Sequence, residues 1–138
     1  MNLSKNVKID RVMNAVAAGT SDQNSASVDM AGFDGVMFIA FLGTLTATQV
    51  TLLTAQHSSD DSSFANITGG STSAMADGDS NKMLFVDVFK PQNRYVRAVV
   101  DRGTANAVID GVLAIQYVGD KAPFTHADVS QSALVVGA

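Results

Sequence analysis

Short apolar stretches separated by polar turn residues run along most of the chain. In chain order these stretches cover residues 12–18, 27–30, 36–42, 48–56, 82–90, 94–101 and 107–118. In the segment 94–101, Val96, Ala98 and Val100 share one face while Arg97 and Asp101 share the other. A two-residue period of this kind is typical of a half-buried β-strand. The pattern predicts about eight strands and contains no helical stripe of useful length.

Two of these segments have features that set them apart. The run Val36 to Leu42 is apolar on both faces, which predicts either a central strand or a strand whose outer face is covered by a partner. The pair Asp110-Gly111 interrupts the last long segment, and it predicts a β-bulge or, as the weaker alternative, a tight hairpin turn.

The composition favours the same fold class. All 13 acidic residues are Asp, and 11 Gly accompany many Val, Ser and Thr. Solvated helices are rich in Glu, whereas Asp, Ser and Gly favour turns and Val and Thr favour strands. We therefore expect an all-β, two-sheet antiparallel β-sandwich. In this single domain, residues 1–11 form an N-terminal arm, residues 12–118 the sandwich and residues 119–138 a C-terminal tail.

Charge and composition exclude several classes of function. There is no cysteine, so disulfides, thiolate metal sites and cysteine nucleophiles are absent. A net charge of -4 without clustered Lys and Arg argues against nucleic-acid binding. The longest apolar run is far shorter than the roughly 20 residues that span a bilayer, and residues 1–15 lack a signal-peptide core. We expect neither nucleic acid nor a membrane as partner.

No motif points to catalysis or to a metal. The only histidines are His57 and His126, and no pattern ties either to a nucleophile. The segment 77–81 begins like a calcium loop but lacks the Gly and Glu that such a loop needs at its sixth and twelfth positions. Asp60-Asp61 beside His57 is better interpreted as a solvated turn than as a metal site. The expectation is no enzyme, no cofactor and no metal.

The two ends of the chain offer candidate partner contacts. Lys5, Lys8 and Arg11 make the arm basic, so the arm could reach an acidic surface on a partner. The tail is apolar, and an apolar terminus is rarely left in water, so it docks on its own domain or on a neighbour. The tail residues that we expect at such a contact are Phe124, Leu134, Val135 and Val136.

Three segments carry a resemblance to a known family: residues 32–39, 56–64 and 94–100, within a region of about residues 28 to 118. Their order resembles that of the small cement or decoration proteins that coat the heads of tailed bacteriophages. The resemblance implies a jelly-roll-like sandwich that binds the outside of an assembled head and ties neighbouring capsid subunits together. It also implies that copies associate as dimers or trimers, and it supplies no catalytic residues.

The expected function follows from both lines of argument. The protein would be made in the host cytoplasm and would act on the capsid exterior of a virion as a structural protein, with the major capsid protein and copies of itself as partners. The alternative is a receptor- or carbohydrate-binding sandwich of a tail fibre or cell surface. That alternative calls for exposed aromatic side chains, yet the chain has no Trp and only Tyr95 and Tyr117 as tyrosines.

Overall fold

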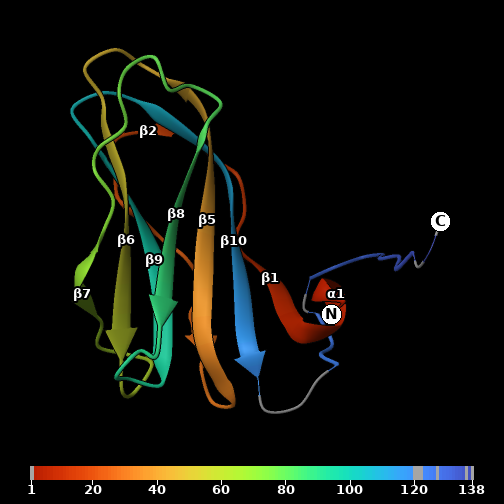
Figure 1. The fold of residues 1–138 in the computed structure, drawn as a ribbon. Helices are drawn as coiled ribbons and strands as arrows, with labels where there is room; N and C mark the ends of the chain where they lie inside the picture. The colour runs from red at the N-terminus through yellow and green to blue at the C-terminus, as the bar shows by residue number, and fades with distance from the viewer. Residues whose placement is uncertain (1, 120–122, 127, 136, 138) are drawn as a thin grey trace.

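The computed structural model describes residues 2–119, 123–126, 128–135 and 137. This part of the chain forms ten strands and one short helix (Figure 1). The elements are α1 (Leu3–Asn6), β1 (Val7–Met13), β2 (Val16–Gly19), β3 (Gln23–Asn24), β4 (Val28–Asp29), β5 (Phe33–Leu45), β6 (Val50–Ser58), β7 (Ala65–Ser71), β8 (Met83–Phe89), β9 (Tyr95–Gly103) and β10 (Ala107–Gly119). No helix among the described residues has the length and apolar character needed to cross a membrane.

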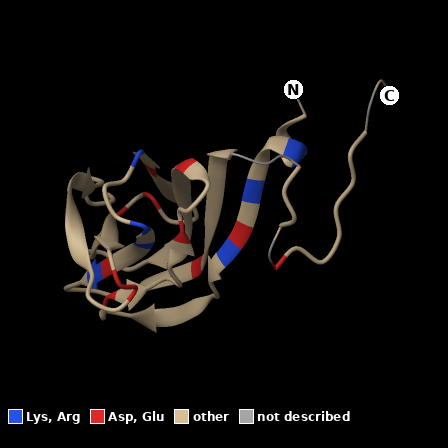
Figure 2. Ribbon diagram, turned by 90° about the horizontal axis from the view of Figure 1, so that it is seen from below, with Lys and Arg blue, Asp and Glu red and all other residues tan. Residues whose placement is uncertain are grey.

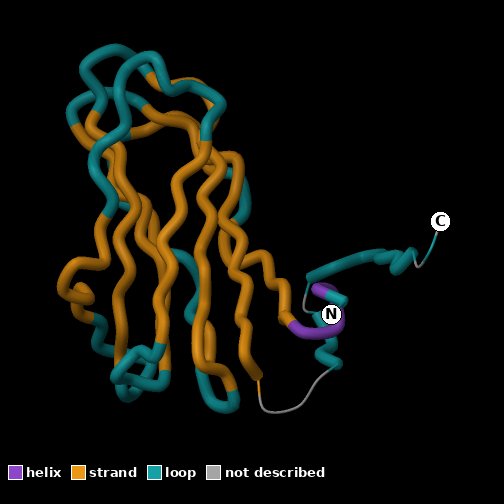
Figure 3. The backbone as a smooth tube through the Cα atoms, in the orientation of Figure 1, coloured by secondary structure: helices purple, strands orange, loops and turns teal. Residues whose placement is uncertain are grey.

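The strands form two antiparallel sheets that face each other. Sheet A has the order β1-β10-β5-β8, and β2 also pairs with β10. Sheet B has the order β3-β9-β6-β7, and β4 also pairs with β9. Figure 3 shows the long strands running side by side, with most connecting loops at the two ends of the sandwich.

The expected all-β sandwich is confirmed, and its strand order is that of a jelly roll. The strand count differs from the prediction because two strands are interrupted. β1 and β2 lie one after the other against β10, and β3 and β4 do the same against β9. Each pair occupies one position in its sheet, so ten strands fill eight positions. The predicted bulge is also present, because the register between β10 and β5 shifts between Ile109 and Gly111.

The arm is shorter than the sequence suggested. Residues 2–6 precede the sandwich, and α1 occupies most of them. From Val7 onward the chain is a strand of sheet A, with Val7 opposite Tyr117 and Ile9 opposite Ile115. The reason is that β10 extends to Gly119 and offers its backbone groups to residues that the arm was expected to leave free.

The core lies between the inner faces of the two sheets. Its fully enclosed side chains alternate along the central strands and include Val36, Phe38, Ala40, Leu42, Leu53, Ala55, Val96, Ala98, Val100, Val112 and Ala114. Gln116 is a polar exception that is 1% exposed, and its Nε2 donates a hydrogen bond to the Asp29 carbonyl oxygen at 2.8 Å. This bond joins sheet A to β4 of sheet B and satisfies the buried amide.

Arg102 ties the two sheets together at one end of the sandwich. Its side chain starts from β9 in sheet B and is 5% exposed. Nε donates to the Ser21 carbonyl oxygen at 2.8 Å, and Nη1 donates to the carbonyl oxygens of Ala17 and Ala107 at 2.9 and 2.8 Å. The guanidinium thus links β9 to β2 and β10 of sheet A, and backbone dipoles compensate for its lost hydration.

We predict that Arg102→Ala lowers the free energy of unfolding by about 2–4 kcal/mol, because three carbonyl groups lose a charged donor. Urea unfolding followed by circular dichroism measures this change. Arg94→Ala is the matched control, since Arg94 forms an exposed ion pair with Asp29 and its loss should have a much smaller effect. Equal effects of the two substitutions would show that Arg102 does not link the sheets.

Candidate interaction surfaces

The face of sheet A that points away from sheet B is almost entirely apolar, and we call it the outer face. Side chains alternate between the two faces of each strand, so the register of the sheet fixes which residues share it. They include Val7, Ile9 and Arg11 of β1, Leu113, Ile115 and Tyr117 of β10, Phe33, Met37, Ile39 and Phe41 of β5, and Met83, Phe85, Asp87 and Phe89 of β8.

The most exposed part of the outer face lies along β8. Phe85 is 61% exposed, Met83 60% and Phe89 58%, and Phe41 of β5 is 42% exposed. Met83 lies opposite Phe41, and Phe85 lies opposite Ile39, so the exposed side chains form a continuous patch. Scattered apolar side chains on a surface are ordinary, but a contiguous apolar patch is characteristic of a contact site.

Tyr117 lies flat on the outer face and reaches from β10 across β5 to β8. A Cβ atom on Gly35 would lie only 2.3 Å from the Tyr117 ring carbon Cζ, so glycine makes room for this ring. The Tyr117 hydroxyl donates a hydrogen bond to the Asp87 carboxylate, and its ring stacks with that of Phe89 at a centroid distance of 6.3 Å. Burial, followed by this hydrogen bond, raises the pKa of Tyr117 to about 12. The hydroxyl therefore keeps its proton at neutral pH and holds Asp87 in place.

The charges of the outer face lie at opposite rims. Arg11 is on β1 at one rim and Asp87 is on β8 at the other. The Arg11 guanidinium lies near Gly111, where an added Cβ would be 3.6 Å from Nη2. Lys90 borders the same face beside Phe89, with Nζ 5.5 Å from the ring centroid. Within the rows from Phe89 to Met83, the central strands β10 and β5 contribute no charged side chain, but Asp110 of β10 lies on the same side just beyond the row of Met83, where a Cβ on Gly43 would be 3.1 Å from its Oδ1.

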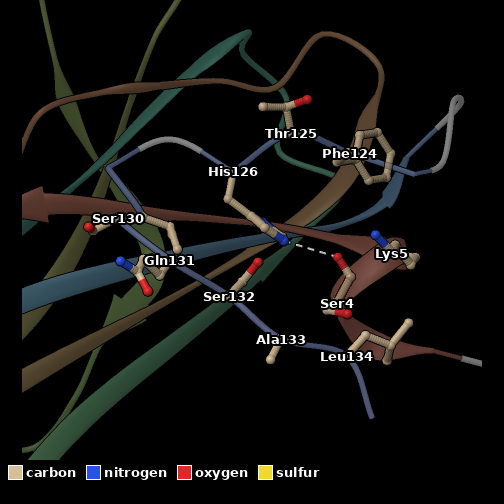
Figure 4. A pocket seen from close by; sticks show the side chains of 11 residues that line it. Ser4, Lys5, Phe124, Thr125, His126, Ser130, Gln131, Ser132, Ala133 and Leu134 are labelled. Carbon is tan, nitrogen blue, oxygen red and sulfur yellow. Dashed lines mark hydrogen bonds between the residues drawn. The ribbon is translucent and has the colours of Figure 1, made fainter. Parts of the chain in front are cut away.

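A second candidate surface lies where the arm meets the tail, at the β1 rim of sheet A (Figures 2 and 4). His126 connects the two segments. Its Nδ1 accepts a hydrogen bond from the Ile9 backbone N–H at 2.9 Å, so Nε2 carries the proton and donates to the Ser4 carbonyl oxygen at 3.0 Å. A cavity of about 440 Å³ opens between α1 and the tail. We call this region the arm–tail rim.

The structure brings together some of the residues that the sequence nominated for partner contact. Lys5, Phe124 and Leu134 line the cavity of the arm–tail rim. The Phe124 ring also packs on its own domain, 4.9 Å from the ring of Phe33. Val135 is 71% exposed and free to meet a neighbour.

The other nominated residues are more scattered. Lys8 and Arg11 lie on β1, and Arg11 belongs to the outer face instead of the arm–tail rim. Val136 lies outside the described residues.

Sequence reasoning did not nominate the exposed side chains of β8. The signal was present, because Met83, Phe85 and Phe89 alternate with Leu84, Val86 and Val88 and thus make β8 apolar on both faces. The same pattern drew attention to the run Val36 to Leu42. β8 was not nominated because Lys82 and Lys90 at its ends and Asp87 within it are typical of an ordinary edge strand.

The loop after β6 is a self-satisfied turn, as the sequence indicated. The Asp60 carboxylate accepts hydrogen bonds from the backbone N–H groups of Ser62 and Ser63, both at 3.0 Å, and from the Ser58 hydroxyl at 2.7 Å. These bonds, that from Ser63 above all, lower the pKa of Asp60 to about 2. Within the described residues, no three His, Asp or Glu side chains gather as metal ligands.

Comparison with solved structures supports the fold. The chain is similar to the PBSX exported protein XepA, with 17% identity and a TM-score of 0.56. The match covers 100% of this chain but 45% of XepA, so this chain spans less than half the length of that protein.

Two further solved structures are more distant. The SPBc2 prophage-derived protein YomS matches with 11% identity and a TM-score of 0.47, over 80% of this chain and 93% of that one. A structure described as Bacillus endospore appendages that form disulfide-linked pili matches with 13% identity and a TM-score of 0.48, over 85% and 92% of the two chains. No protein-family profile and no curated protein sequence matches this chain.

We predict that the Asp60 turn contributes to acid stability. Because the folded-state pKa of Asp60 lies below its ordinary value of 3.8, its contribution is present above that value and is lost as the pH falls toward 2. Thermal unfolding between pH 4 and pH 2 should show a shallower loss of stability in Asp60→Asn than in the wild type. Asp61→Asn is the control, since Asp61 accepts a hydrogen bond from the Ser27 hydroxyl instead of from the turn. A carboxyl titration of Asp60 centred at 3.8 would contradict the prediction.

Proposed function

We propose that this protein is a structural component of a bacteriophage particle that binds the outer surface of the head and bridges major capsid subunits. The observation that supports this most is the fold likeness to the PBSX exported protein XepA, which extends over the whole of this chain. The family resemblance of residues 28 to 118 points in the same direction. In this proposal the protein acts by adhesion and not as an enzyme.

The arm–tail rim is the surface that we assign to the shell. It combines a basic side chain, Lys5, with the exposed apolar side chains Leu134 and Val135. In Figure 1 the C-terminal tail extends away from the sandwich beside α1, so both segments can reach a neighbouring surface. A protein that binds only the assembled shell stabilises it by mass action, and the effect is repeated at every symmetry-related site.

The carbohydrate-binding alternative has weaker support. Phe41, Phe85 and Phe89 supply exposed rings that could stack on a sugar, in a chain that has no Trp. A sugar also needs several polar groups to bind its hydroxyls. On the outer face Asp87 is already bonded to Tyr117, and Arg11 lies at the far rim. This surface therefore suits apolar packing better than sugar recognition.

The test is to compare phage heads assembled with and without the protein. We expect heads that lack it to form but to open at a lower temperature or lower external salt, with electron cryo-microscopy placing the protein at symmetry-related positions outside the shell. Heads of equal robustness, or no added density outside the shell, would overturn the proposal.

Substitutions of Lys5 in the arm and of Lys8 at the start of β1 test the assigned surface. Lys5→Glu combined with Lys8→Glu should weaken binding to heads by about tenfold, because the added charges repel an acidic shell. Lys82→Glu is the matched control, since Lys82 is also exposed but lies just before β8, on the opposite rim of sheet A. Thermal unfolding of each variant confirms that the fold is retained. Equal binding by all three proteins would assign the shell contact to another surface.

A further inference from the structure

We infer that the outer face of sheet A docks on the same face of a second copy of this chain, related by a two-fold axis that runs parallel to the strands. This inference goes beyond the proposed binding to a phage head and stands without it. It concerns the rows of β1, β10, β5 and β8 from Phe89 to Met83, whereas the tail packs on the sheet beyond these rows, with Phe124 against Phe33 and Gly119.

The apolar character of the outer face requires a partner that is itself apolar and nearly flat. Phe85, Met83 and Phe89 expose more than half of their surface, and β10 and β5 add half-buried aliphatic side chains between the rims. A second copy supplies the same surface, and two sheets that pack face to face interdigitate such side chains at a spacing of about 10 Å. A second copy of this chain therefore offers the apolar surface that the outer face requires of its partner.

The charges select this partner and the direction of the axis. A two-fold axis along the strands between β10 and β5 places β1 of one copy over β8 of the other. Arg11 lies in the row of Phe85, one row away from Asp87. In this arrangement each Arg11 lies over the β8 rim of the partner, displaced by about 7 Å along the strand from the partner's Asp87. An arginine side chain is long enough to span this displacement. The dimer contains this contact twice, once at each rim.

The other simple arrangement is electrostatically unfavourable. An axis perpendicular to the strands would place β8 over β8 and β1 over β1. The two Asp87 carboxylates would then approach each other at one rim and the two Arg11 guanidinium groups at the other. Like charges next to each other in a contact are destabilising, so this arrangement is disfavoured. Lys90 adjoins Phe89 at one end of the face. At the other end, beyond the row of Met83, the axis along the strands brings the two Asp110 carboxylates near each other, and this single repulsion opposes the two Arg11 contacts.

The size of the face sets the expected affinity. Four strands with a spacing of about 4.8 Å and four rows about 7 Å apart give roughly 540 Å² of planar area per copy. Projecting side chains increase the accessible area to the lower end of specific interfaces, which bury about 600–800 Å² per partner. We therefore expect a reversible dimer with a Kd of about 1–100 µM.

Sedimentation equilibrium of the full chain, from about 1 µM to 1 mM, measures this association. Phe85→Ser should raise the Kd at least about tenfold, because it removes an exposed ring at the contact. Val50→Ser is the matched control, since Val50 is 44% exposed on β6 of sheet B, and it should leave the Kd within about twofold. Thermal unfolding of both variants shows whether the fold is intact.

A charge exchange tests the orientation. Arg11→Asp and Asp87→Arg should each raise the Kd about fivefold, and the double variant should return to within about threefold of the wild type. Tyr117→Phe controls for the hydrogen bond that Asp87→Arg removes, because it deletes the same bond without changing any charge. Recovery in the double variant is a result that a merely structural role of either residue would not produce.

Several outcomes would overturn the inference. One is a chain that stays monomeric up to about 1 mM. Another is a dimer whose Kd is the same in the wild type and Phe85→Ser. A third is a glycan, or the phage shell, protecting Phe85 from solvent while the isolated chain remains monomeric. Failure of the proposed function is distinguishable from these, because Phe85→Ser chains that no longer dimerise can still be tested for binding to heads.

Discussion

The structure depends on the hydrogen-bonded pairing of β5 with β10. These two 13-residue strands are far apart in the sequence, yet they lie antiparallel along almost their whole length, from Phe33 opposite Gly119 to Leu45 opposite Ala107. Their register decides which side chains enter the core and which form the outer face. β1 and β2 add to one side of this pair and β8 to the other, so sheet A is built around it.

The local elements could be predicted from the sequence, but their assembly could not. Alternation and turn residues located the long strands, and Asp110-Gly111 marked the bulge correctly. The jelly-roll order rested on a family resemblance, because strand neighbours are chosen by contacts between distant segments. Arg102 could not be assigned to the interior, since the carbonyl groups that stabilise it come from two separate segments, residues 17–21 and Ala107. Of the candidate surfaces, the basic arm and apolar tail were visible in the sequence, whereas Phe85 was overlooked.

The two rims of sheet A expose different side chains, so each rim suits a different kind of partner. At β1, the tail covers part of the strand edge through the hydrogen bonds of His126. The arm–tail rim there presents both basic and apolar side chains. At β8, the strand has a neighbour on one side only and exposes three large apolar side chains. The proposed contact with a shell and the proposed contact between copies would therefore use different parts of the same sheet.

The exposed position of β8 also bears on aggregation. An edge strand with unpaired backbone groups is a template on which further chains can add, strand upon strand, into insoluble fibrils. In this chain, Lys82 and Lys90 flank β8, and Pro91, which has no backbone N–H to donate, follows at once. Positive charge at both ends of a short strand and a proline beyond it restrict such growth. The strand that carries the exposed apolar patch is thus bounded by residues that disfavour the addition of further strands.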